Sequence, residues 1–111
     1  MSVVFLRNKN NDSVVDIEIW TKKAVNGRPF TELRAVVDIR LYSEVLLNNL
    51  DRSEDIIADF QEISELRGWL WEKRLHPNND GTKTDEIRRE VEDMLEVIGR
   101  KYSLAVVVDY Q

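Results

Sequence analysis

The sequence predicts an α+β fold: a mostly antiparallel β-sheet with two main helices on one face, in the order β-β-β-α-α-β. Two observations lead to this prediction. Strand-like segments, one of them strictly alternating apolar and polar residues, fill much of the first half. Two stretches in the second half instead repeat apolar residues at helical spacing, and an apolar segment rich in valine follows them.

Length and composition fit one globular domain over residues 1–111, large enough to bury a core without disulfides. The formal net charge is −5, with 21 acidic against 16 basic residues. This balance argues against unaided binding to nucleic acid or an anionic membrane, where a basic face is expected. The chain has no cysteine and no apolar run of signal or membrane-span length, so we expect a cytoplasmic location.

The first part of the chain predicts two hairpins. Residues 3–6 form a short apolar strand, residues 8–12 have the composition of a turn, and residues 14–20 alternate as a half-buried strand. These two strands are expected to pair as the first hairpin. Residues 33–42 are expected to return as the third strand after a turn at Asn26-Gly27.

The connection to the third strand is predicted to have an odd length or a bulge. A two-residue loop at Asn26-Gly27 would place Ile17 opposite Val36, so that core and solvent faces would clash. A shift of one residue exchanges the two faces of a strand, and Pro29 also weakens pairing nearby. The inward residues of the third strand are then Leu33, Ala35, Val37, Ile39 and Leu41, and the outward ones Glu32, Arg34, Asp38 and Arg40.

Residues 51–75 predict one long amphipathic helix. Residues 43–50 before it are expected to be a short helix, with a strand extension as the alternative. Asp51 and Glu54 have the spacing of an N-terminal capping box. Gly68 leaves open whether the helix kinks, and the residue before Pro77 is its expected end. Its core stripe consists of Ile56, Phe60, Ile63 and Leu70, with Ile57 and Trp71 at the edge.

A second helix is predicted from Thr82 or Thr84 to about Lys101. Acidic residues open it and basic residues close it, which suits the helix dipole at both ends. Residues 104–108 are apolar throughout, so we expect a strand that is covered on both faces or central in its sheet. The apolar stripe of the helix consists of Ile87, Val91, Met94, Leu95, Ile98 and Tyr102.

No motif in the chain predicts catalysis, a metal site or a cofactor site. His76 is the only histidine, and the end of a helix suits it as a capping residue. The segment Asn78-Asn79-Asp80-Gly81 does not fit a calcium loop, because Asp80 at the fifth position would put Ile87 at the twelfth. No glycine pattern fits a phosphate loop. We therefore expect a protein that is not an enzyme and needs no cofactor.

The predicted site is a partner-binding surface on the long helix. Asp55, Glu62 and Glu65 follow one side of it, and Trp69 projects away from the core stripe. Acidic surfaces with an aromatic anchor suit a basic protein partner, because charges speed association and a buried aromatic side chain supplies affinity. The alternative is that Trp69 belongs to a second core stripe. A second acidic surface is predicted on the open face of the sheet, at Asp16, Glu18 and Asp38.

A small, acidic, cysteine-free α/β chain with hairpins and two helices resembles the immunity proteins of bacterial contact-dependent growth inhibition and related polymorphic toxin systems. The resemblance concerns the character of the whole chain, so it assigns no role to any residue. It implies a protein that binds and blocks a cognate toxin domain, commonly a cationic nuclease. Two alternatives stay open: a small homodimeric regulatory or phage-type adaptor protein, and an enzyme that uses carboxylates alone.

Overall fold

A computed structural model of the chain describes the backbone of residues 1–75 and 84–110, and the side chains of residues 1–66 and 84–110. A 3₁₀ turn, η1 (Leu50–Arg52), precedes the second helix. In chain order the other elements are β1 (Ser2–Arg7), β2 (Ser13–Lys23), β3 (Pro29–Val37), α1 (Ile39–Asn48), α2 (Ser53–Leu75), α3 (Thr84–Tyr102) and β4 (Ala105–Tyr110).

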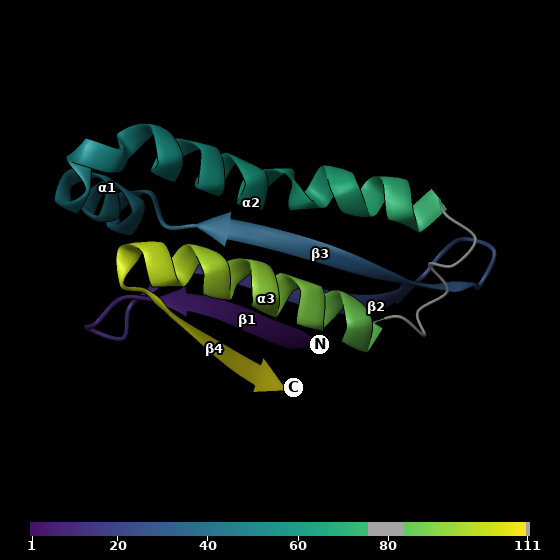
Figure 1. Cartoon of the computed structure of the whole chain (residues 1–111). Helices are drawn as coiled ribbons and strands as arrows, with labels where there is room; N and C mark the ends of the chain where they lie inside the picture. Colours follow the sequence, from purple (N-terminus) through teal and green to yellow (C-terminus); the bar gives the residue numbers. More distant parts are fainter. Residues whose placement is uncertain (76–83, 111) are drawn as a thin grey trace.

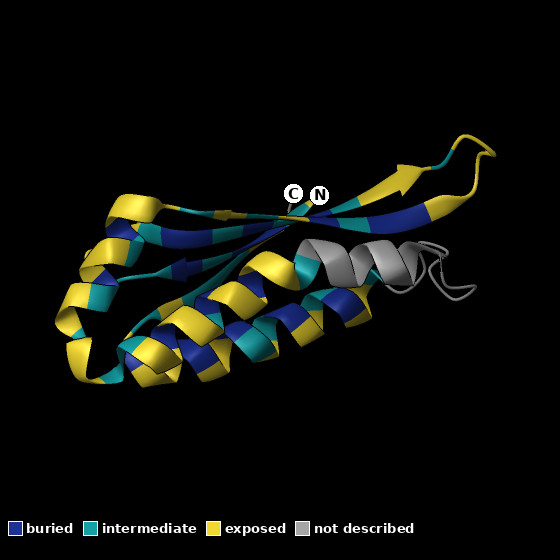
Figure 2. Ribbon diagram, turned by 90° about the horizontal axis from the view of Figure 1, so that it is seen from above, coloured by how far each residue is buried: buried dark blue, intermediate teal, exposed yellow. Residues whose placement is uncertain are grey.

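The strands form one antiparallel sheet in the order β3-β2-β1-β4. Figures 1 and 2 show α2 and α3 side by side on one face of this sheet, with α1 at one end. No described helix covers the opposite face. The predicted α+β fold and its order of elements are confirmed, with α1 as the short helix expected before the long one.

Both predicted hairpins are present. In the first, Val4 lies opposite Ile17, which puts both on the core face. In the second, Ile17 lies opposite Ala35, one residue away from the register that a two-residue loop would impose. The Ala24 amide donates to the Arg28 carbonyl and the Gly27 amide to the Ala24 carbonyl, each at 2.9 Å. Three residues therefore make the loop, and the predicted odd length is confirmed.

Glycine is needed at the last position of that loop. Gly27 has a φ of 79°, in the left-handed region that side chains with a Cβ rarely adopt. The Asn26 side chain accepts a hydrogen bond from the Arg28 amide at 3.0 Å and closes the turn.

The third strand was predicted over residues 33–42, but it begins earlier, at Pro29, and also ends earlier. It ends at Val37, and the Asp38 carboxylate then accepts a hydrogen bond from the Leu41 amide at 3.0 Å as the N-cap of α1. Leu41 and Val45 are buried at i, i+4 spacing, whereas Ile39 is 76% exposed instead of facing inward. The prediction of a strand to residue 42 was wrong because this cap and this helical stripe outweigh the alternating pattern.

The long helix begins later than its predicted cap. Asp51 lies inside η1, and α2 runs from Ser53 through Gly68 to Leu75. Ile56, Phe60 and Ile63 are buried as predicted, and Ile57 is half exposed at the edge of the stripe. The side chains of Leu70 and Trp71 lie outside the described residues, as do His76, Pro77, Thr82 and the predicted loop at 78–81.

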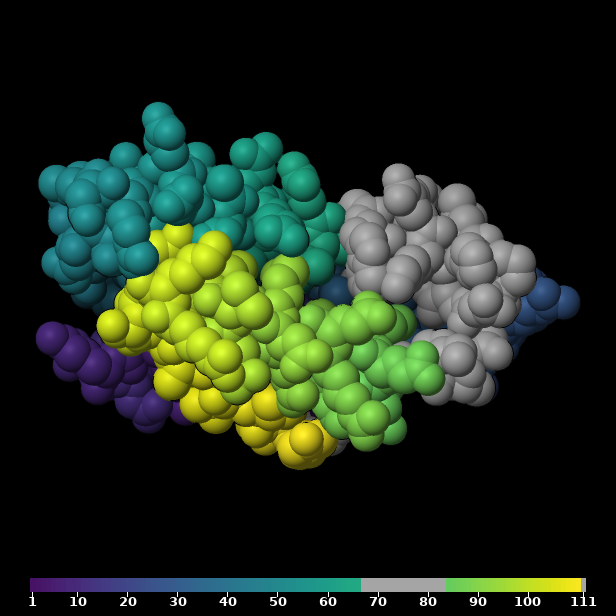
Figure 3. Space-filling view, in the orientation of Figure 1, coloured from purple at the N-terminus to yellow at the C-terminus, as the bar shows by residue number. Residues whose placement is uncertain are grey.

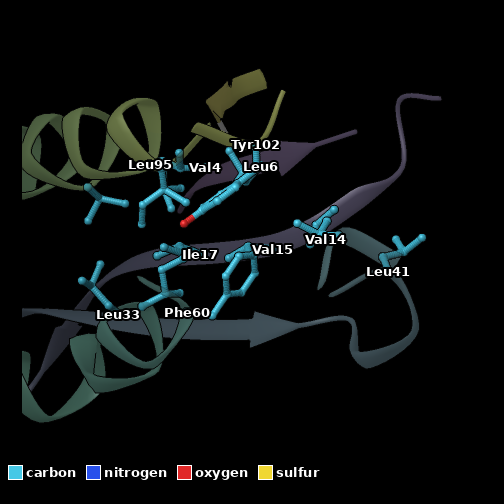
Figure 4. Close-up of a cluster of buried hydrophobic side chains, with 14 of the residues drawn as sticks. Val4, Leu6, Val14, Val15, Ile17, Leu33, Leu41, Phe60, Leu95 and Tyr102 are labelled. Carbon is cyan, nitrogen blue, oxygen red and sulfur yellow. The ribbon is translucent and has the colours of Figure 1, made fainter. Parts of the chain in front are cut away.

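The stripe of α3 is buried against the sheet as predicted, except that Met94 is only half-buried. Figure 4 shows Leu95 and Tyr102 from α3 among Val4, Leu6 and Ile17 from the sheet. The prediction for the last strand was wrong in one respect: β4 lies at an edge, and Val106–Val108 are only half-buried. A run of valines indicates apolar surroundings on both faces, but it does not indicate how many strands lie alongside.

No helix among the described residues combines the length and the apolar character needed to cross a membrane.

Candidate partner-binding surface

An open groove of about 380 Å³ is lined by residues of α2 and α3. Figure 3 shows the surfaces of α2, in teal, and α3, in green to yellow, in contact with each other. Val91 is buried and Leu66 and Met94 are half-buried, so these three side chains form an apolar floor. The described residues that line the groove are Glu62, Glu65, Leu66, Glu90, Val91 and Met94.

Helix geometry explains why carboxylates border this floor. On α2, Glu62 and Glu65 are at i, i+3 spacing, so they project from the same side of the helix. On α3, Glu90 lies next to Val91 in the sequence and therefore just outside the buried stripe. Each helix thus turns its core-facing residues toward the sheet and these glutamates toward the groove.

The groove is acidic without a basic residue among its described lining side chains. All three glutamates are exposed. Glu62 makes no hydrogen bond or ion pair that involves a described residue, and Glu65 accepts a hydrogen bond from the Gln61 amide group at 3.3 Å.

The structure brings together two of the four predicted site residues. Glu62 and Glu65 line the groove, whereas Asp55 is exposed two helical turns earlier and is not part of the lining. The side chain of Trp69 lies outside the described residues, so its predicted role as an anchor stays a prediction. Sequence reasoning missed Glu90, although its position beside the buried stripe of α3 was available as a signal.

A neighbouring carboxylate, Asp59, is occupied by structural contacts. The Tyr102 hydroxyl donates to it at 2.6 Å, and the Lys101 ammonium lies 3.2 Å away. Burial raises the pKa of Tyr102, and the hydrogen bond to Asp59 raises it further, so this phenol stays protonated as a donor at neutral pH. Asp59 therefore links α2 to the end of α3 and is not available to a partner.

The second predicted acidic surface is less suited to a cation. Asp16 and Glu18 do lie on the open face of the sheet, but Asp38 caps α1 instead. Burial raises the pKa of Asp16 despite the opposing effect of the Arg7 charge, and one of its oxygens has no hydrogen-bond partner among the described residues. The Trp20 indole donates to Glu18 at 3.1 Å.

A hollow of about 440 Å³ on this face mixes charges of both signs. Lys22 and Glu32 pair in it at 2.6 Å, and Arg34 lines it as well. The groove between α2 and α3 is smaller, but its charge has a single sign. We therefore place the candidate site in the groove.

A third hollow of about 380 Å³ lies beside α1 and α2, and no charged side chain lines its described part. Its edge includes Ile39 and Ile57, which are 76% and 50% exposed. This hollow offers apolar contact area but no preference for a charged partner.

Among the described residues, no three Asp, Glu or His side chains are grouped closely enough to hold a metal ion. No protein-family model matches the sequence, and neither a curated protein nor a solved structure matches the chain.

Proposed function

We propose that this chain is a non-catalytic binding protein, an immunity protein that binds and neutralises a cognate basic toxin domain of nuclease type in the cytoplasm. The observation that carries the proposal is the groove between α2 and α3. There, three carboxylates surround an apolar floor, and no described lining residue is basic.

This combination suits a lysine or arginine side chain from a protein. The aliphatic stem of such a side chain packs on an apolar floor, and its charged end stays at the polar rim. Leu66, Val91 and Met94 provide the floor, and the glutamates provide acceptors for charge-assisted hydrogen bonds. A small metal ion would have no use for the apolar floor.

The charge of the whole chain supports the same partner. A net charge of −5 attracts a cationic domain over the distance at which charges are not screened, about 8 Å at physiological salt. A nuclease must carry a basic surface to bind phosphates, so an acidic protein that covers this surface blocks its activity. Neutralisation then needs no catalytic residue.

The test uses the C-terminal domain of the protein encoded immediately upstream of this chain. Its expression should stop the growth of a bacterial host, and co-expression of this chain should restore growth. With the purified pair, Glu62→Lys combined with Glu65→Lys should slow association at least about tenfold, because electrostatic steering accounts for factors of this size. The salt dependence of the association rate should fall as well.

The matched control is Glu44→Lys combined with Glu96→Lys. Both residues are exposed, on α1 and α3, and neither lines the groove, while the change in net charge is the same. The control should associate much closer to the wild-type rate. Equal effects of the two double variants would contradict the groove as the site, and an upstream domain without toxicity would contradict the function.

A further inference from the structure

We infer that two copies of this chain pair through the outer edge of β4, antiparallel about a twofold axis, and so continue the sheet from one copy into the next. The inference does not rest on the proposed function. It starts from a mismatch between the sequence of β4 and its place in the sheet.

The side chains of β4 are suited to packing against a strand on either side. Three consecutive valines, Val106–Val108, point alternately to the two faces, and β-branched side chains gain stability from the residues opposite them on a neighbouring strand. Within the described residues, however, β1 is the only strand that pairs with β4. All three valines are consequently left half-buried. A second strand alongside would complete their burial.

The other edge strand is protected in ways that β4 is not. β3 begins with a proline and carries Glu32 and Arg34 on its open face, features that discourage pairing with another chain. β4 contains no proline, lysine or arginine, and it pairs with β1 over six consecutive residues without a bulge. Its regular edge, with three consecutive valines, is suited to pairing.

Self-pairing about Val107 gives a favourable arrangement of side chains. In an antiparallel pair the opposed residues share a face, so Val107 would meet its own copy and Val106 would meet Val108 of the other copy. Asp109 would lie opposite the small Ala105 of the other copy.

The register of this pairing favours a second copy over other partners. A twofold axis at Val107 matches the valines of β4 with one another and puts no two like charges opposite each other. The same axis also leaves α2 and α3 of both copies on one side of the continued sheet, with neither groove covered by β4.

The absence of cysteine from the chain makes a cross-linking test specific. Opposed residues in an antiparallel pair have Cα atoms about 4.5–5.5 Å apart, which lies within the range of a disulfide. Val107→Cys should therefore form a covalent dimer under mild oxidation. Val36→Cys is the control, because this valine is 46% exposed on the open face of the other edge strand. It should stay monomeric.

A charge exchange tests the same contact without oxidation. Sedimentation of the wild-type chain should show a dimer. Val107→Lys and Val107→Glu should each sediment as monomers with wild-type circular dichroism, since like charges would meet at the axis. An equimolar mixture of the two variants should restore the dimer. Restoration also shows that both variants fold.

Three outcomes would overturn the inference. They are a monomeric wild-type chain, a dimer that neither substitution weakens, and single variants that dissociate but do not recombine when mixed. None of these measurements involves a toxin domain, so their outcome is independent of the proposed function.

Discussion

Gly99 shows how a single residue holds α3 close to the strands. A Cβ built at this position would lie 2.5 Å from the Leu104 carbonyl oxygen and 3.2 Å from a methyl group of Leu6. The carbonyl of Gly99 accepts a hydrogen bond from the Leu104 amide at 2.9 Å, and Ser103 between them has a φ of 58°. The chain therefore leaves the helix through a left-handed residue and turns at once into β4.

Gly99→Ala should consequently destabilise the protein. Within a helix this change normally stabilises by about 1 kcal/mol, but overpacking a tight contact costs typically about 1–3 kcal/mol. The Leu104 oxygen belongs to the backbone and cannot easily move away. We expect a lower midpoint of thermal unfolding, measured by circular dichroism.

Ser103→Gly is the comparison for that experiment. It places a glycine at the left-handed position of the same turn, so it should raise the midpoint. A Gly99→Ala protein that unfolds above the wild-type temperature would contradict the close approach of α3 to Leu104.

Individual residues of the candidate site were only partly predictable. The helical spacing of Glu62 and Glu65 placed them on one side of α2, and the structure has both in the groove. Glu90 comes from another helix, and a sequence does not state which sides of two helices face each other. Asp38 was assigned to the sheet face because the alternating pattern continues through it, whereas its side chain caps α1.

At the scale of elements, the predictions held where two signals agreed. In α3, the apolar stripe, the acidic start and the basic end all indicate the same helix, which the structure contains from Thr84 to Tyr102. The odd-length loop before β3 followed from the requirement that core residues face each other. The predicted end of β3 was wrong because residues 38–42 fit two patterns. Their apolar and polar residues alternate as in a strand, and their apolar residues also have helical spacing.

Leu95→Ala tests the structural role of α3. The side chain is fully buried among residues from the sheet, and truncating a buried leucine to alanine costs roughly 2–5 kcal/mol of stability. Chemical denaturation should show this loss as a lower midpoint with an unchanged slope.

The matched surface change is Glu96→Gln on the same helix. Glu96 is exposed, so the change should alter stability by less than about 0.5 kcal/mol. If Leu95→Ala unfolded at the wild-type denaturant concentration, the assignment of this stripe to the core would be wrong.

At the scale of the whole molecule, the fold class could be predicted but the neighbours of β4 could not. Periodicity reports which faces of an element are covered, and the α+β class follows from that alone. The position of a strand within a sheet depends on long-range pairing, which leaves no mark on the strand itself. In β4, half-buried valines occur together with an outer edge that no described strand pairs with, and both favour a second copy alongside.

Pairing through β4 and binding in the groove together predict how many toxin domains a dimer binds. A twofold axis at Val107 would put the helices of both copies on one side of the sheet, each copy with its own acidic groove between α2 and α3. The wild-type dimer should then bind two basic toxin domains. Val107→Lys, as a monomer, should bind one domain with nearly the same affinity per groove, because the groove is built from a single chain.

Light scattering during chromatography gives the mass of each complex, and calorimetry gives the affinity per site. The double variant Glu62→Lys and Glu65→Lys should show the reverse behaviour, keeping the dimer and weakening binding. If Val107→Lys abolished binding while remaining folded, the partner would need both copies, and the site would extend across β4 instead of lying within one groove. If the wild-type dimer bound a single domain, the two grooves could not act independently, and a partner that spans the twofold axis would replace the arrangement of one domain per chain.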